Sequence, residues 1–332
     1  MRGGAVRFFL SLNGYGIPAP GQGAGFYAET AAPVLIYFVD HPAHHHPTVR
    51  APLPHLAVTF ATESEAAFCR AHVRSDIPVR ALAHAAAAST EAPPAWETRD
   101  VPLLFSASLH AEPEALRAGW CQHGAAVERS LNDVVAAHDA APARPLGETV
   151  LDVIGRDDRP IAILASYIAA ADLYIRNRQR RALVTTLAHL PLLVCGKGWE
   201  SLAAESAVPG KAARFLAAQP APAAAALMRR AKLVLNPMPA YYDSHERPFQ
   251  AMAAGAVAAT GPSNLFGVAE FAGALLSLPA APRNAAARIE AALADEDALQ
   301  SVAAAGTRVQ AAAHRWDDRA RSLIAMAGGF EA

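Results

Sequence analysis

Short apolar runs alternate with longer helical stretches along the chain. Residues 34–39 form a continuous apolar run with β-branched and aromatic side chains, which is typical of a strand buried on both faces. Residues 56–60 and 101–106 have the same character and predict two more strands. A helix is predicted over residues 63–73, because Thr62 is a capping residue and acidic side chains occupy the first turn. The N-terminal part of the chain therefore combines strands with helices.

The rest of the chain repeats this alternation. Helices are predicted at residues 112–140, 161–189, 212–216, 223–232, 266–271, 283–294 and 299–327, and strands at residues 79–82, 192–194, 233–235, 256–260 and 275–277. Strands separated by helices favour an α/β fold with a parallel sheet in each half of the chain. A proline-rich break at residues 141–146 predicts one domain over residues 1–145 and another over residues 146–332. The first is short for a complete doubly wound domain, so we expect it to be reduced.

Length, charge and cysteine usage narrow the class of protein. A chain of 332 residues is typical of about two domains. The formal net charge of −1 leaves no basic excess for a nucleic-acid backbone. No apolar run reaches the ~18 residues of a membrane span, and the apolar piece within residues 1–10 is too short for a signal peptide. The three cysteines are far apart and form no CxxC motif, so we expect free thiols and a cytoplasmic protein.

Charged and hydrogen-bonding residues gather between a predicted strand and a predicted helix, in residues 236–260. His245, Glu246 and Arg247 lie at the start of an Ala/Met-rich helix. Ligands bind at this kind of turn in open α/β sheets, because backbone N–H groups and the positive end of the helix converge there. Arg247 is suited to clamp a diphosphate, His245 to add a donor, and Glu246 to accept from a sugar or ribose hydroxyl. The alternative is a capping cluster, with Ser244 as N-cap and Arg247 solvated.

Two glycine positions in the C-terminal half have two interpretations each. Lys197 and Gly198 belong to the segment Gly196-Lys197-Gly198, which comes directly after a predicted strand. Such a segment suits a phosphate or sugar loop. The same residues also fit a tight turn with Trp199 packed behind it. Gly255 marks either a close approach of the helix to a strand or ligand, or a plain helix end.

A positive cluster adds to the candidate chemistry of the C-terminal half. Arg176, Arg180 and Arg181 lie on one predicted helix, where Arg176 and Arg180 share a face. One of them would reach the phosphates of a ligand, or all three would form a solvated helix face.

Asp40 and His41 end the first long strand and are candidate catalytic residues. Residues at the carboxyl ends of parallel strands face the ligand crevice, and either side chain would deprotonate a hydroxyl there. We favour His41 slightly, because its reference pKa lies nearer neutrality. The alternative is that Asp40 caps the next turn and His41 is a packed polar group. His44, His45 and His46 are adjacent and lack a carboxylate or cysteine at ligand spacing, so no metal site is expected.

Several of these residues, taken in order, resemble those of a known family. The blocks are Asp40-His41-Pro42, Leu103-Leu104-Phe105-Ser106-Ala107-Ser108, Arg180-Arg181 through Gly196-Lys197-Gly198-Trp199, and Asp243 through Gly255. Together they resemble the group-1 glycosyltransferases with the GT-B fold, in particular the CgeB-like, spore-maturation-protein-like branch. Ala107 stands where this branch usually has glycine. The resemblance extends from about Asn13 to Phe271, which is most of the chain.

The resemblance implies a fold, an activity and a set of site residues. It implies two facing Rossmann-like domains, with a nucleotide-diphosphate sugar held mainly by the C-terminal one and the sugar moved to an acceptor hydroxyl in the interdomain cleft. The acceptor, a glycan, a protein or a small molecule, is expected to enter from the N-terminal side. The expected substrate-binding residues are Lys197, Gly198, His245, Glu246, Arg247, Gln250 and Gly255, and the expected catalytic residues are His41 and Asp40. No Asp-x-Asp motif stands at a strand end, so neither a metal nor another cofactor is expected.

One pair of positions departs from the family pattern. Many retaining members have glutamates where this chain has Gln250 and Tyr242. Gln250 is able to hydrogen-bond a ribose hydroxyl but offers no carboxylate, so this signature does not support retaining stereochemistry. Two alternatives therefore remain beside the transferase. They are a non-catalytic nucleotide-sugar-binding or assembly protein of the same fold, and a sugar-nucleotide epimerase.

Overall fold

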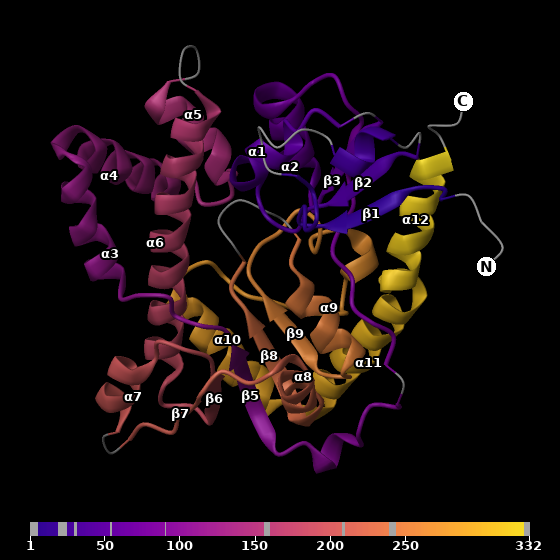
Figure 1. The fold of residues 1–332 in the computed structure, drawn as a ribbon. Helices are drawn as coiled ribbons and strands as arrows, with labels where there is room; N and C mark the ends of the chain where they lie inside the picture. Colours follow the sequence, from indigo (N-terminus) through magenta and orange to yellow (C-terminus); the bar gives the residue numbers. More distant parts are fainter. Residues whose placement is uncertain are drawn as a thin grey trace. The chain divides into compact units, whose positions relative to one another are not determined.

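The computed structural model describes residues 6–18, 25–29, 32–53, 55–89, 91–155, 160–207, 210–238 and 244–328 (Figure 1). The chain forms two compact units. Unit 1 consists of Met1–His84, Ser130–Ala171 and Asp317–Ala332, and unit 2 of Ala85–Arg129 and Asp172–Trp316. Each unit contains one parallel sheet, so the predicted α/β class with two Rossmann-like sheets is confirmed.

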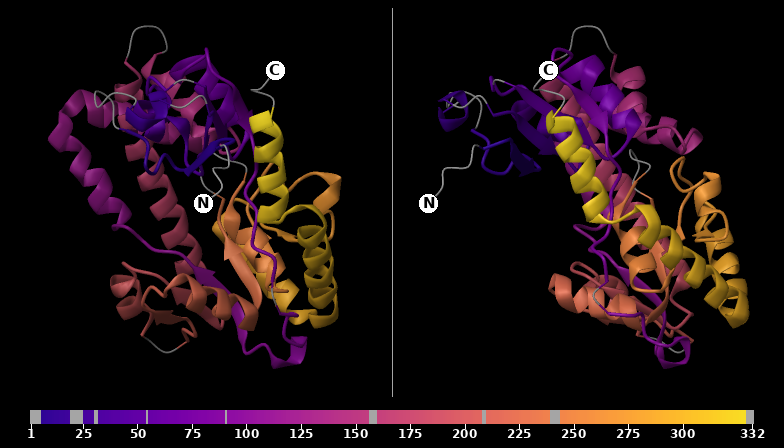
Figure 2. Two further views of the ribbon diagram at one scale, coloured as in Figure 1. Left: turned by 45° about the vertical axis from the view of Figure 1, so that its right-hand side comes forward. Right: turned by 90° about the vertical axis from the view of Figure 1, so that its right-hand side faces the viewer.

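The sheet of unit 1 has four parallel strands in the order β1-β2-β3-β4. The strands are β1 (Phe9–Leu12), β2 (Val34–Tyr37), β3 (Leu56–Phe60) and β4 (Val79–Ala81). Every residue of β2 and β3 is buried, as the continuous apolar runs predict. The C-terminal helix α12 (Trp316–Gly328) packs Leu323 and Ala327 against Leu35 and Ala57 of these strands (Figure 2).

Unit 1 also contains helices. They include α1 (His46–Val49), α2 (Glu63–Phe68) and α5 (Leu146–Ile154). Thr62 and Glu65 form a capping box at the start of α2, so the predicted helix start is confirmed. The helix then widens into a π-helical turn, η3 (Cys69–Val73). The helices α4 (Ala125–Ala140) and α6 (Ile161–Leu187) contribute residues to both units.

The sheet of unit 2 has six parallel strands in the order β10-β9-β8-β5-β6-β7. The strands are β5 (Val101–Ser106), β6 (Leu192–Cys195), β7 (Arg214–Leu216), β8 (Ala231–Asn236), β9 (Val257–Thr260) and β10 (Leu276–Ser277). Side chains alternate between two apolar clusters, with Leu103 and Phe105 in one and Leu104 in the other. The central strands are therefore covered on both faces.

Six further helices belong to unit 2 in the part of the chain that is described. They are α3 (Pro113–Gly119), α7 (Glu200–Ser206), α8 (Ala221–Arg230), α9 (Glu246–Ala253), α10 (Pro282–Ala294) and α11 (Glu296–Ala313). The predicted strand–helix–strand passage through β8, α9 and β9 is confirmed. It places the start of α9 at the carboxyl end of β8.

The structure corrects several predicted elements. Residues 212–216, predicted as a helix, contain the edge strand β7, because Arg214–Leu216 pairs in register with β6 and this pairing outweighs helix propensity. Residues 266–271 form turns and a short 3-10 segment, Ala269–Phe271, instead of a helix. The predicted helix over residues 112–140 is interrupted at Gly124, whose φ of 95° is incompatible with a helix.

The two compact units divide the chain differently from the predicted boundary at residues 145 and 146. Strand β5 pairs with both β6 and β8, so it occupies a central position in the sheet of unit 2. Helix α12 packs on unit 1, although it ends the chain. Both differences arise from long-range packing, which the proline-rich break does not encode.

Candidate functional site

The order of strands in unit 2 defines where a ligand is expected. After β5 the chain adds β6 and β7 on one side, and then returns to add β8, β9 and β10 on the other. The connections that leave β5 and β8 therefore diverge, and ligands of open parallel sheets bind at this switch, outside the carboxyl ends of the strands. The residues that follow β5 and β8 are the candidates for a site.

A chain of hydrogen bonds fixes Arg247 at this edge of the sheet. The last residue of β8, Asn236, is 1% exposed and donates from Nδ2 to Oγ1 of Thr260, the last residue of β9, at 3.1 Å. Nη1 of Arg247 donates to Oδ1 of Asn236 at 2.9 Å. Because both bonds originate at strand ends, the guanidinium is tied to the rigid part of the sheet. We did not predict the roles of Asn236, which follows the predicted strand 233–235, and of Thr260, which ends the predicted strand 256–260.

His245, Glu246 and Gln250 surround Arg247 at the start of α9. His245 is the N-cap residue with an extended backbone (φ −147°, ψ 145°), and its side chain makes no capping hydrogen bond. Burial raises the pKa of Glu246, although hydrogen bonding to Gln250 and the charge of Arg247 act in the opposite direction. The first turn of this helix thus combines backbone donors, a guanidinium and a carboxyl group. The N-cap position of α9 is occupied by His245, and not by Ser244 as the capping alternative expected. Tyr242 and Asp243 lie outside the described residues.

Gly255 lies at the other end of α9, about 12 Å of helix away at 1.5 Å per residue. Its φ is 71°, and the amide N–H of Ala256 donates to the carbonyl of Ala251 at 2.9 Å, which is the bond of a Schellman helix end. A Cβ on Gly255 would lie 2.5 Å from Cβ of Pro93. The local structure thus explains this glycine, and it is not brought together with Arg247.

The glycines of Gly196-Lys197-Gly198 pack against the loop that follows β5. A Cβ on Gly196 would lie 2.1 Å from the carbonyl oxygen of Ala107, and one on Gly198 would lie 1.8 Å from that of Leu109. Trp199 donates from Nε1 to the carbonyl of Ala107 at 2.7 Å. The tight-turn interpretation therefore accounts for both glycines, while the side chain of Lys197 is exposed at the carboxyl end of β6.

Two arginines of α6 lie near the loop after β5. Arg180 donates from Nη1 to the carbonyl of Ser108 at 2.7 Å, and Arg176 forms an ion pair with the buried Asp172. The pKa of His110 is lowered by partial burial and by the charges of Arg176 and Arg180. Arg180 and the exposed Lys197 thus form a positive region beside the loop after β5, whereas Asp172 balances the charge of Arg176.

Arg181 belongs to a different environment. It forms ion pairs with Glu112 at 2.7 Å and Glu205 at 2.8 Å. Two carboxylates balance its charge, so it does not extend the positive region.

In unit 1, His41 is a buried, neutral side chain. It is 2% exposed, and its Nδ1 accepts from the amide N–H of Ala43 at 3.2 Å, so the proton of the neutral ring is on Nε2. Burial, followed by the neighbouring His44 and His45, lowers its pKa well below the usual range. A Cβ on Gly147 would lie 2.8 Å from Nε2. This arrangement matches the packed-polar alternative for His41 and favours Asp40 as the base.

Asp40 is half-exposed, with 49% of its side chain accessible, and is held by two neighbours. Its Oδ2 accepts from Nδ2 of Asn13 at 3.3 Å and lies 3.5 Å from Nε2 of His45. Asn13 has a φ of 50°, and its Oδ1 accepts from the amide N–H of Val39 at 2.9 Å. The ring of His45 stacks on Phe38 at 4.4 Å. We did not predict a role for Asn13, because the strand that it follows, β1, was not predicted either.

Two further findings concern metals and membranes. Within the ranges that the structure describes, no group of three or more His, Cys, Asp or Glu side chains is arranged to hold a metal ion. The same ranges contain no helix that is long and apolar enough to cross a membrane.

Comparison with solved structures defines the fold. The chain is similar to a sucrose-phosphate synthase from Thermosynechococcus elongatus, with a TM-score of 0.52 and 13% identity over 90% of this chain and 68% of that one. It is also similar to a glycosyltransferase from Rickettsia africae ESF-5, with a TM-score of 0.50 and 8% identity over 91% of this chain and 72% of that one. At these identities the likeness concerns the fold alone, which is the two-sheet GT-B fold of glycosyltransferases.

Comparison with protein families adds sequence information. Residues 176–325 match the family described as glycosyl transferase-like. The matched segment contains Lys197, Arg247 and Gln250, but not Asp40 or His41. No curated protein matches the chain in sequence. The C-terminal part of the chain is thus glycosyltransferase-like in both sequence and fold.

Proposed function

We propose that the protein is a glycosyltransferase that moves a sugar from a nucleotide-diphosphate donor to an acceptor hydroxyl. The family match over residues 176–325 and the GT-B fold support the class of reaction. The proposal is more specific than this class of reaction in two respects. The first is the kind of donor and acceptor, and the second is membership of the CgeB-like branch, which depends on the four residue blocks of the sequence.

One observation carries the proposal, which is the anchoring of Arg247. Its guanidinium is tied through Asn236 to Thr260, so it is oriented before any ligand arrives. A planar, permanently charged fork at the carboxyl edge of a parallel sheet is suited to a diphosphate, and pre-organisation reduces the entropy lost on binding. The N-terminus of α9 adds backbone donors for the same charge.

The remaining residues have assigned roles in this proposal. Lys197 and His245 add positive charge or donors for the diphosphate, and the backbone of Gly198 keeps the lysine loop in place. Glu246 and Gln250 bind hydroxyl groups of the ribose or the sugar. Asp40 is the favoured base for the acceptor hydroxyl, with His41 as the less favoured candidate. We also propose that transfer needs no metal, and that the protein, with its three free cysteines, is cytoplasmic.

Calorimetric titration with UDP, GDP, dTDP and their sugar conjugates tests the donor site. We expect at least one nucleotide to bind, and the Arg247→Ala variant to bind it at least tenfold more weakly, because a charge-assisted hydrogen bond contributes ~1.5–3 kcal/mol. Arg230→Ala is the matched control, since Arg230 is ion-paired with Asp100 next to the amino end of β8. If no nucleotide binds at millimolar concentration, or if both variants bind like the wild type, the donor site is not where we place it.

A second candidate function is a non-catalytic nucleotide-sugar-binding protein of the same fold. The buried, Nε2-protonated ring of His41 favours it, because such a ring has no lone pair on Nε2 to accept a proton. The two candidates differ in one measurement, the release of sugar from the bound donor with added EDTA and in its absence. A transferase releases or transfers sugar in both conditions, whereas a binding protein leaves the donor intact.

A further inference from the structure

A hollow of ≈ 450 Å³ lies on unit 1, and none of the candidate site residues discussed so far lines it. Eight residues line it, and they are Arg50, Arg70, Ala71, His72, Val73, Arg74, Ser75 and Asp76. All of them come from the end of α1 and from η3 and the residues that follow it. Arg70 contacts the carbonyl of Val79 at the first residue of β4, so the hollow is at the amino edge of the sheet. Its volume is in the range of small-molecule sites.

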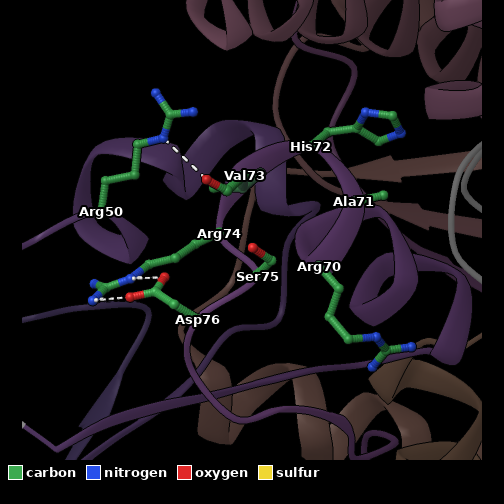
Figure 3. A pocket seen from close by; sticks show the side chains of 8 residues that line it. All are labelled: Arg50, Arg70, Ala71, His72, Val73, Arg74, Ser75 and Asp76. Atoms are coloured by element: carbon green, nitrogen blue, oxygen red, sulfur yellow. Dashed lines mark hydrogen bonds and ion pairs between the residues drawn. The ribbon is translucent and has the colours of Figure 1, made fainter.

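The π-helical turn η3 places the arginines around this hollow. The amide N–H of Arg74 donates to the carbonyl of Cys69 at 2.9 Å, which closes the five-residue turn. Such turns cost stability and are frequent at functional sites. Figure 3 shows Arg50 and Arg74 on one side of the hollow, whereas Arg70 extends away from them. Arg70 forms an ion pair with Glu63, so its charge is balanced.

Arg50 differs from the other two arginines in its charge balance. Within the described part of the chain it bonds only through Nε, which donates to the carbonyl of Val73 at 3.1 Å. Among the described residues no carboxylate lies within ion-pair distance of Arg50, and its side chain is exposed at the hollow. Both of its Nη groups therefore present a charged fork to a ligand.

Arg74 is a second fork that Asp76 occupies. Its Nε and Nη2 donate to the two carboxylate oxygens of Asp76 at 2.9 and 3.3 Å. Its Nη1 donates to the carbonyls of Val49 and Ala51 at 3.0 and 2.8 Å, which fixes the side chain beside the hollow. The pKa of Asp76 is lowered by its hydrogen bonds to Arg74, so this carboxylate is ionised and satisfied by one partner.

We propose that this hollow binds a phosphoryl group, with Arg50 as the main contact and Arg74 as a contact that Asp76 controls. A phosphoryl group carries up to two negative charges and several acceptor oxygens, so it is able to use both forks. This site is additional to the proposed donor site of unit 2. It belongs to unit 1, at the amino edge of the sheet β1-β2-β3-β4, and we expect nucleotide binding through Arg247 of unit 2 to be independent of it.

The test is a titration of the whole chain with inorganic phosphate at constant ionic strength. Binding is monitored by NMR through the Nε–H signals of ¹⁵N-labelled arginine side chains. We expect the Arg50→Ala variant to bind phosphate at least tenfold more weakly, and Arg50→Lys, which keeps the charge, to lie between it and the wild type. Asp76→Asn is expected to bind at least threefold more tightly, because it removes a repelling charge and releases the fork of Arg74. Arg80→Ala, which changes an exposed arginine of β4 outside the hollow, is expected to match the wild type.

A second arm separates the sources of the group. Tighter binding of glucose 6-phosphate than of inorganic phosphate supports a phosphorylated molecule as the ligand, and the reverse supports the free anion. The proposal is overturned if Arg50→Ala binds phosphate like the wild type, if Asp76→Asn weakens binding, or if acetate binds as well as phosphate. Nucleotide titration of the same Arg50 variants tests the donor site separately, because that binding should not change.

Discussion

At the residue scale, Asn13 orients the side chain of Asp40. Asn13 donates from Nδ2 to Oδ2 of Asp40 at 3.3 Å. If Asp40 is the base, removal of this donor leaves its carboxylate less well positioned for the acceptor hydroxyl. We therefore expect kcat/KM to fall about tenfold in Asn13→Gly and Asn13→Ala alike.

These two variants separate the loss of the hydrogen bond from backbone strain. Glycine adopts the φ of 50° freely, whereas alanine there costs about 1 kcal/mol. Only Asn13→Ala should therefore show an additional loss in the free energy of unfolding, measured with urea. An unchanged kcat/KM in both variants would contradict the role of Asn13 in orienting Asp40.

The site residues show which chemistry a sequence reveals. The position of Arg247 and His245 at a strand-to-helix turn was predictable, because charged residues there are typical of ligand sites, and their roles stay predictions. Asn236, Thr260 and Asn13 were not predicted, because their roles depend on which strands are neighbours in the sheet. Pairings over tens of residues leave no periodic signal.

At the element scale, the loop after β6 depends on a glycine with a defined conformation. Gly198 has a φ of 79°, and a Cβ there would lie 1.8 Å from the carbonyl oxygen of Leu109. We expect Gly198→Ala to lower the free energy of unfolding by more than 2 kcal/mol, because a clash with backbone adds to the conformational cost.

Gly124 provides the matched control for this prediction. Its φ is 95°, but no atom lies within 4 Å of a Cβ placed on it. Gly124→Ala should therefore cost only about 1 kcal/mol in a parallel urea titration. Equal losses in the two variants would show that the contact with Leu109 does not constrain the loop.

Predicted elements differ in reliability for a physical reason. Residues 56–60 and 101–106 were predicted with their observed bounds, because buried parallel strands need continuous apolar runs. Strand β7 and the short strand β1 were not predicted, because they lie at the edges of their sheets and contain exposed or mixed residues. Edge strands depend on their partner more than on their own sequence.

At the scale of the whole molecule, buried ionisable groups of unit 1 define how stability varies with pH. Burial raises the pKa of Glu65 from 4.5 to about 8 and lowers that of His84 from 6.5 to about 4. The folded state therefore keeps a proton on Glu65 that the unfolded state loses above pH 4.5. The unfolded state, conversely, binds a proton on His84 below pH 6.5 that the folded state excludes.

The signs of these two effects are opposite. Stability from Glu65 is fully present below pH 4.5 and is lost as the pH rises through 8, whereas that from His84 is present above pH 6.5 and is lost as the pH falls through 4. His41, whose pKa is also lowered, acts in the same direction as His84. Together the three groups place the highest stability near pH 6.5, with a decline on either side.

Comparison of the wild type with a Glu65 variant isolates Glu65 above pH 6.5, because the contributions of the histidines are the same in both proteins. At ~1.4 kcal/mol per proton and pH unit, the wild type should lose about 2 kcal/mol of the contribution of Glu65 between pH 6.5 and pH 8. Glu65→Gln has no titrating proton, so its urea midpoint should decline less over the same interval. Glu63→Gln, which changes an exposed glutamate of the same helix, should decline like the wild type. Identical pH dependence in all three proteins would mean that Glu65 is ionised in the folded state. The buried Oε1 has no hydrogen-bond partner among the residues that the structure describes, which argues against that outcome.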